Sequence, residues 1–131
     1  MTTANGFIPY FGYNDAAAAI DFLTNAFGFK ITARYDDEKG RVVHAELRAD
    51  DAILMLGSTD AETKSRSLPE GTGIYLPVDD PDEHFKRSKN AGAHIVWVPH
   101  NTEFGTRRYR VRDPEGYEWS FGNYRPDLVN L

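Results

Sequence analysis

The sequence predicts an α+β domain built from two copies of a strand–helix–three-strand unit. Three observations support this fold class. First, "YNDAAAAIDFLTNAFGFKI", which begins at Tyr13, aligns with "VDDPDEHFKRSKNAGAHIV", which begins at Val78, at an offset of 65 residues. Second, "ILMLGS" (53–58) falls on "EWSFGN" (118–123) at the same offset. Third, the segments around each helix-like stretch alternate apolar and polar residues, which is the period of β-strands.

The first unit is expected to span residues 7–58. It opens with an alternating strand that ends at Asn14–Asp15, a pair that can cap a helix. Leu23 and Phe27 fall on one stripe of the helix that follows, and Gly28 is expected to stop it. The expected elements are a strand at 7–13, a helix at 15–27, and strands at 29–37, 41–50 and 51–58.

The second unit, residues 73–124, repeats this order, and its helix is expected to stop at "NAG". Each helix should cover one face of an antiparallel-rich sheet. The Ser-, Thr- and Gly-rich stretch 59–72 is expected to be a linker, and 125–131 a C-terminal tail of the same single domain, 1–131. The expected elements are a strand at 73–79, a helix at 81–90, and strands at 93–99, 106–112 and 117–123.

Composition limits the classes of function. The chain has 131 residues, of which 40% are hydrophobic, and this suits one globular domain. A net charge of −5 makes a nucleic-acid partner unexpected, because phosphate binding needs a basic face. The absence of cysteine excludes disulfides and thiolate metal sites. No apolar run approaches membrane-spanning length, and no secretory leader is visible, so we expect no membrane partner and a cytoplasmic location.

The motif G-T-R-x-Y-x-V-x-D-P-E-G-x-x-W-S-F, at 105–121, and the tandem βαβββ order resemble the vicinal oxygen chelate superfamily. That superfamily includes glyoxalase I, extradiol dioxygenases, fosfomycin-resistance enzymes and bleomycin-resistance proteins. The resemblance covers about residues 7–126. It implies a U-shaped mixed sheet with helices on the convex side, a small-molecule ligand in the concavity, and a homodimer. Function still has to be argued from the site.

The resemblance also implies four symmetric positions for metal ligands, two on the first strands of the units and two on the last. In this sequence they fall on Ile8, Gly73, Met55 and Ser120. None of these side chains is an imidazole or a carboxylate, the ligands that a divalent metal prefers. We therefore expect no metal and no other cofactor, although a divalent metal at non-standard ligands remains the alternative.

Glu118 is the candidate for a displaced metal ligand, because it shares a strand face with Ser120. The alternative is a carboxylate that pairs across the strands with Arg112 or Arg110. One carboxylate without a convergent histidine is a weak metal site. We therefore expect the pairing.

Strand alternation predicts which residues face the concavity. In the third strand of the first unit Val43, Ala45 and Leu47 should pack on the helix. In the corresponding strand of the second unit Tyr109 and Val111 should do so. The candidate ligand-binding residues on the opposite faces are Tyr10, Glu46, Arg48, Met55, Tyr75, Arg108, Arg110, Glu118 and Ser120. They suit a polar, anionic or aromatic molecule, because Arg grips anions and Tyr stacks on rings. The alternative is an open, solvated face on which these charges neutralise each other.

His44 is the candidate catalytic residue, since imidazole exchanges protons near neutral pH. Glu46 lies two residues on, on the same face, so that a His–carboxylate pair can form. The alternative is a partly solvated strand histidine with no catalytic role.

Three functions remain open. The first, which we prefer, is metal-independent binding of a small molecule, as in bleomycin-resistance-type sequestering proteins. The second is a glyoxalase-like lyase, an isomerase or a related enzyme that uses a non-standard metal site, or His44 as its acid–base group. The third is a regulatory or dimerisation module whose cavity is filled by its own side chains.

Overall fold

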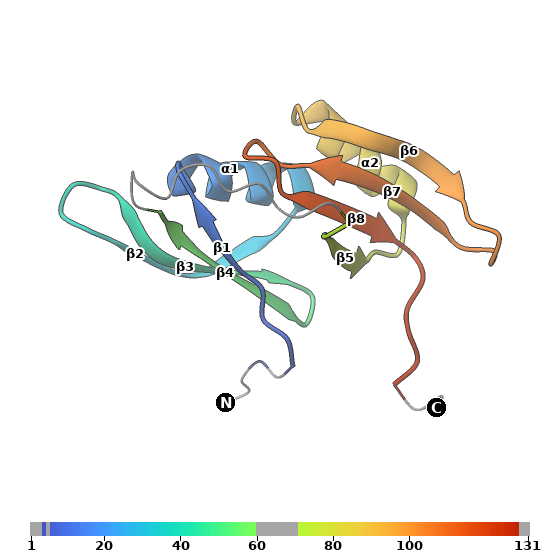
Figure 1. The fold of residues 1–131 in the computed structure, drawn as a ribbon, viewed down its shortest axis with the longest axis horizontal. Helices are drawn as coiled ribbons and strands as arrows, with labels where there is room; N and C mark the ends of the chain where they lie inside the picture. The colour runs from blue at the N-terminus through green and yellow to red at the C-terminus, as the bar shows by residue number, and fades with distance from the viewer. Residues whose placement is uncertain (1–3, 5, 60–70, 129–131) are drawn as a thin grey trace. The chain divides into compact units, whose positions relative to one another are not determined.

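The computed structural model describes residues 4, 6–59 and 71–128, and these fall into two compact units on either side of segment 60–70. Each unit contains a strand, a helix and three further strands, in that order (Figure 1). The predicted α+β class and the two tandem βαβββ units are therefore confirmed. The linker and the tail were predicted at 59–72 and 125–131, and parts of both lie outside the described residues.

All ten predicted elements are present, and β1 and β5 are both shorter than predicted, four residues each rather than seven. The first unit consists of β1 (Tyr10–Tyr13), α1 (Ala16–Phe27), β2 (Lys30–Asp36), β3 (Val42–Ala49) and β4 (Ala52–Ser58). The second consists of β5 (Ile74–Pro77), α2 (Pro81–Asn90), β6 (His94–Asn101), β7 (Arg107–Arg112) and β8 (Glu118–Gly122).

Each unit forms its own four-stranded mixed sheet. The strand orders are β1-β4-β3-β2 and β5-β8-β7-β6, so the two sheets have the same topology. The first strand of each unit pairs with the last in parallel, and the other neighbours are antiparallel. The parallel pair places residues that are far apart in the sequence, such as Tyr10 and Met55, directly side by side.

The two helices start in the same way. Oδ1 of Asp15 accepts a hydrogen bond from the backbone N–H of Ala18 at 3.0 Å. In α2, Oδ1 of Asp80 accepts one from the backbone N–H of Glu83 at 3.2 Å. Such caps satisfy a backbone donor that has no partner within the helix. Gly28, with φ of 79°, ends α1 in the left-handed conformation that glycine adopts without strain. None of the helices within the described ranges is long and apolar enough to cross a membrane.

The second unit holds a largely polar helix against an aromatic sheet face. Tyr109, Trp119 and Phe121 are buried there, and α2 packs His84 on the ring of Phe121 with a centroid distance of 4.1 Å. The hydroxyl of Tyr109 lies 2.5 Å from Nδ1 of His84 and 2.7 Å from Oγ of Ser88. Burial raises the pKa of the Tyr109 hydroxyl far above its ordinary value, so this group stays a neutral hydrogen-bonding partner.

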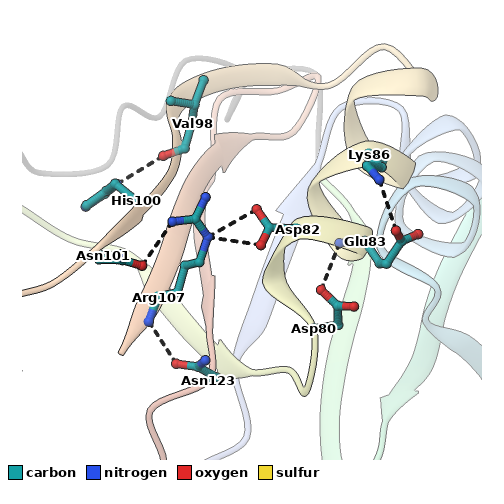
Figure 2. A network of polar contacts seen from close by, with 9 residues as sticks. All are labelled: Asp80, Asp82, Glu83, Lys86, Val98, His100, Asn101, Arg107 and Asn123. Atoms are coloured by element: carbon teal, nitrogen blue, oxygen red, sulfur yellow. Dashed lines mark hydrogen bonds and ion pairs between the residues drawn. The ribbon is translucent and has the colours of Figure 1, made fainter. Parts of the chain in front are cut away.

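Arg107 fastens the start of the same helix to the sheet (Figure 2). Its Nε donates to both carboxylate oxygens of Asp82, at 3.1 and 3.0 Å, and its Nη1 donates to Asn101 at 3.0 Å. Its backbone N–H donates to Oδ1 of Asn123 at 2.8 Å. One side chain thus links α2 with β6 and β7, and we assign Arg107 a structural role.

Three hairpin turns share one five-residue pattern, in which an Asp or Thr begins the turn and glycine stands three residues later. The first side chain accepts hydrogen bonds from backbone N–H groups two and four residues on, at 2.9–3.4 Å. The glycine has φ between 81° and 93°, which a side chain would strain. The turns span 37–41, 102–106 and 113–117.

The expectation that Val43 packs on the helix is wrong. Val43 is 59% exposed, and Val42 takes the buried place at 1%. The reason is a bulge, because Tyr35 faces His44 whereas the next residue, Asp36, faces Val42. Beyond the bulge the predicted alternation holds in β3, where Ala45 and Leu47 are buried. It also holds in β7, where Tyr109 and Val111 are buried.

Two turn aspartates offer a matched test of stability. Asp37 and Asp113 make the same two backbone hydrogen bonds, but Asp113 is buried and its Oδ2 also accepts from Nε1 of Trp119 at 3.3 Å. We expect Asp113→Ala to lower the free energy of unfolding by about 2–4 kcal/mol and Asp37→Ala by about 0.5–1.5 kcal/mol. Urea unfolding measures both losses, and equal losses would contradict the special role of Asp113.

Candidate functional site

In the first unit the candidate residues form a row across the sheet, on the face opposite the buried side chains. Met55 of β4 pairs with Tyr10 on one side and with Glu46 on the other. Arg48, two residues after Glu46 on β3, pairs with Ile53 of β4. The sheet therefore brings together Tyr10, Glu46, Arg48 and Met55, as the alternation predicts.

His44 lies two residues before Glu46 on β3 and contacts its carboxylate. Its Nε2 lies 2.9 Å from Oε2 of Glu46, a distance at which a ring N–H donates to a carboxylate. The ring of Tyr35 stacks on the imidazole with a centroid distance of 6.3 Å and an interplanar angle of 27°. Tyr35 was not among the predicted site residues, although its register opposite His44 puts it on the same face. The catalytic role of His44 stays a prediction.

In the second unit, arginines occupy the equivalent row. Ser120 of β8 pairs with Tyr75 and with Arg110, and Nε of Arg110 donates to Oγ of Ser120 at 2.9 Å. Glu118 accepts from Nη1 of Arg110 at 3.3 Å and lies 3.0 Å from Nη2 of Arg112. The expected pairing of Glu118 with arginine is therefore present, and it involves both candidate partners.

Trp97 completes this face, although it was not among the predicted site residues. The guanidinium carbon of Arg110 lies 4.4 Å from the indole ring centroid, and that of Arg108 lies 5.5 Å away. The indole remains 41% exposed. The pairing of β6 with β7 is irregular on both sides of Trp97, so simple alternation along β6 cannot place it. The strand register, in which Trp97 pairs with Arg110 of β7, would have placed Trp97 on the face of the arginines.

Each of the two tyrosines of the site lies against a glycine. A Cβ atom at Gly57 would lie 2.6 Å from the backbone oxygen of Val43 and 3.2 Å from the hydroxyl of Tyr10, and one at Gly122 would lie 2.9 Å from the hydroxyl of Tyr75. The pairs are related by the 65-residue offset. The Tyr75 hydroxyl also donates to the backbone oxygen of Tyr124 at 2.7 Å. Burial raises the pKa of Tyr75, partly offset by this hydrogen bond and the charges of Arg125 and Arg108.

The four positions at which the family would place metal ligands do not fit a divalent metal. Ile8 and Gly73 carry no donor atom, and Met55 offers only a thioether. Ser120 offers a hydroxyl that already accepts from the Arg110 guanidinium, and this cation would repel a metal ion. Among the residues that the structure describes there is no group of three or more metal-binding side chains.

Comparison with known proteins identifies relatives along most of the chain. A family model for the Glyoxalase/Bleomycin resistance protein/Dioxygenase superfamily matches residues 10–121. An uncharacterized protein of Mycobacterium bovis is 34% identical over 123 residues, covering 87% of this chain and 80% of its own length. The crystal structure of TioX from Micromonospora sp. ML1 matches with a TM-score of 0.75 and 32% identity, covering 93% of this chain and all of that one.

Glyoxalase I from Zea mays is a more distant match. A mutant of that enzyme has a TM-score of 0.75 at 19% identity, over 91% of this chain and 44% of the maize chain. At that identity the match shows a common fold and carries no argument about activity.

The two tryptophans offer a test of the electrostatics of the site. Trp119 is 1% exposed, so collisional quenching of fluorescence should report Trp97, which lies beside two guanidinium groups. We expect the ratio of iodide to caesium quenching to be several times that of free N-acetyltryptophanamide, and added salt to bring the two ratios together. Trp97→Phe should abolish most quenching. A ratio equal to that of N-acetyltryptophanamide would contradict a cationic surface.

Proposed function

Because the chain belongs to the glyoxalase/bleomycin resistance protein/dioxygenase superfamily, we propose that it binds a small aromatic or anionic molecule without a metal ion. The function would resemble that of the bleomycin-resistance proteins that sequester their ligands. One observation carries the proposal: Arg110 stacks on a partly exposed Trp97 and stands beside Arg108.

The chemistry of this group suits a flat, polarised ligand. An exposed indole offers a surface on which another ring can stack, and a guanidinium can grip an anion with two parallel hydrogen bonds. Arg110 is held by Ser120 and Glu118, so its plane is fixed before a ligand arrives. Such preorganisation lowers the entropy lost on binding.

The donor atoms support binding without metal, since the four family positions offer only the Ser120 hydroxyl and the Met55 thioether. The homodimer, the cytoplasmic location and the other side chains of the predicted site stay predictions.

Chelator-treated protein is expected to bind planar aromatic compounds as tightly as untreated protein. A panel containing aromatic acids and neutral aromatics, followed by thermal shift and calorimetry, measures this. Trp97→Ala should weaken binding by about tenfold or more, because a stacking surface is lost. Val98→Ala, on the next exposed residue of β6, is the control and should leave binding unchanged. Stoichiometric metal in the purified protein, together with loss of binding on chelation, would contradict the proposal.

A second candidate function rests on His44 and Glu46. We propose, as the alternative, that this pair serves as an acid–base group for lyase or isomerase chemistry. The supporting observation is the 2.9 Å contact of Nε2 with the carboxylate, because a carboxylate partner stabilises the imidazolium that forms when the ring accepts a proton.

For this alternative we expect the protein to exchange protons that lie α to a carbonyl group. Incubation with hydroxyacetone in deuterated water, followed by NMR, would show loss of the carbon-bound proton signal. His44→Gln should abolish the exchange above background. Tyr35→Phe, which keeps the ring stacked on the imidazole, should retain it. Exchange that survives His44→Gln would exclude His44 as the base.

A further inference from the structure

The three arginines on one face of β7 have different surroundings. Arg110 is bound to Ser120 and Glu118, and Arg112 is bound to Glu118. The guanidinium of Arg108 makes no hydrogen bond or ion pair within the part of the chain that the structure describes, and its guanidinium carbon lies 5.5 Å from the ring centroid of Trp97. Among the described residues, Arg108 is therefore a cation on this face whose guanidinium donates no hydrogen bond.

The adjacent Arg107 differs from Arg108 in that its guanidinium has polar partners. Arg107 points to the helix side, where Asp82 and Asn101 occupy its guanidinium (Figure 2). Arg108, the next residue of the same strand, points the other way because side chains alternate along a strand. Within the described ranges, Arg107 is thus bound to Asp82 and Asn101, and the guanidinium of Arg108 has no polar partner.

Aromatic groups lie next to Arg108. The Trp97 ring centroid is 5.5 Å from its guanidinium carbon. Across β8, Tyr75 and Arg108 meet over Gly122, where an added Cβ would lie 2.9 Å from the Tyr75 hydroxyl and 3.0 Å from Cβ of Arg108. Glycine at this position therefore permits the approach. Tyr75 is held there by its hydrogen bond to the backbone oxygen of Tyr124.

The charges on this face leave a surplus of cations. Among the described residues, the three guanidinium groups of β7 have one carboxylate partner on this face, Glu118, which Arg110 and Arg112 share. A guanidinium with free donors on a partly dehydrated aromatic surface binds a planar carboxylate better than its neutral analogue. Building on the proposed function, we infer that Arg108 makes this site selective for aromatic carboxylates over neutral aromatic molecules of the same shape.

The probes are 2-naphthoate and 2-naphthamide, which share a ring system and differ in charge, and isothermal titration calorimetry measures both dissociation constants. We expect the wild-type protein to prefer the carboxylate by about 10- to 100-fold, the range for a charge-assisted hydrogen-bonded pair. Arg108→Gln should remove this preference and leave the affinity for the amide unchanged.

Lys89→Gln is the matched control, because it removes one positive charge from α2, where Lys89 lies over the ring of Phe85, on the other side of the same sheet. This variant should keep the preference. Unchanged melting temperatures would show that both variants fold. If wild-type protein binds both probes equally, or if Arg108→Gln keeps the preference, the inference is overturned while aromatic binding stands. If wild-type protein binds neither probe, the proposed function at this site fails as well.

Discussion

The hydrogen bonds of one buried carboxylate determine how the second sheet presents its side chains. Asp113 accepts from the backbone N–H groups of Glu115 and Tyr117 and from the indole of Trp119. These contacts fix both the length of the turn and the depth of the first buried ring on β8. Because side chains alternate, a one-residue slip would exchange the two faces of the strand. Trp119 and Phe121 would then leave the helix side of the sheet, and Ser120 would turn toward it.

The two units share one strand order but carry different side chains at equivalent positions of their sheets. Position 46 in the first sheet and position 110 in the second both face the last strand, next to Met55 and Ser120 respectively. The first is a glutamate paired with His44, and the second is an arginine stacked on Trp97. The tyrosine over a glycine is common to both units. The backbone arrangement is thus repeated, while the side chains at these positions differ: a histidine–glutamate pair in the first sheet and an arginine–tryptophan contact in the second.

Periodicity and capping residues were sufficient to predict the order of elements and most of the buried faces. Asp15, Asp80 and Gly28 act locally, so their effects are visible in the sequence. The pairing of Glu118 with arginine was also predictable, since cross-strand neighbours follow once the register is known. Val43 and Trp97 could not be placed from alternation alone. Both lie at irregular pairings, and a bulge depends on the partner strand as much as on its own residues.

The pairing of strands within units bears on how the chain folds. Every strand pair in the described ranges joins elements of the same unit, including the parallel pairs that link its first and last strands. None of these described ladders therefore has to wait for the closure of a loop that spans the whole chain, and the entropy of loop closure stays modest. Low sequence separation between contacting residues accelerates folding. The first βαβββ unit can complete its own ladders during synthesis, before the second unit has left the ribosome.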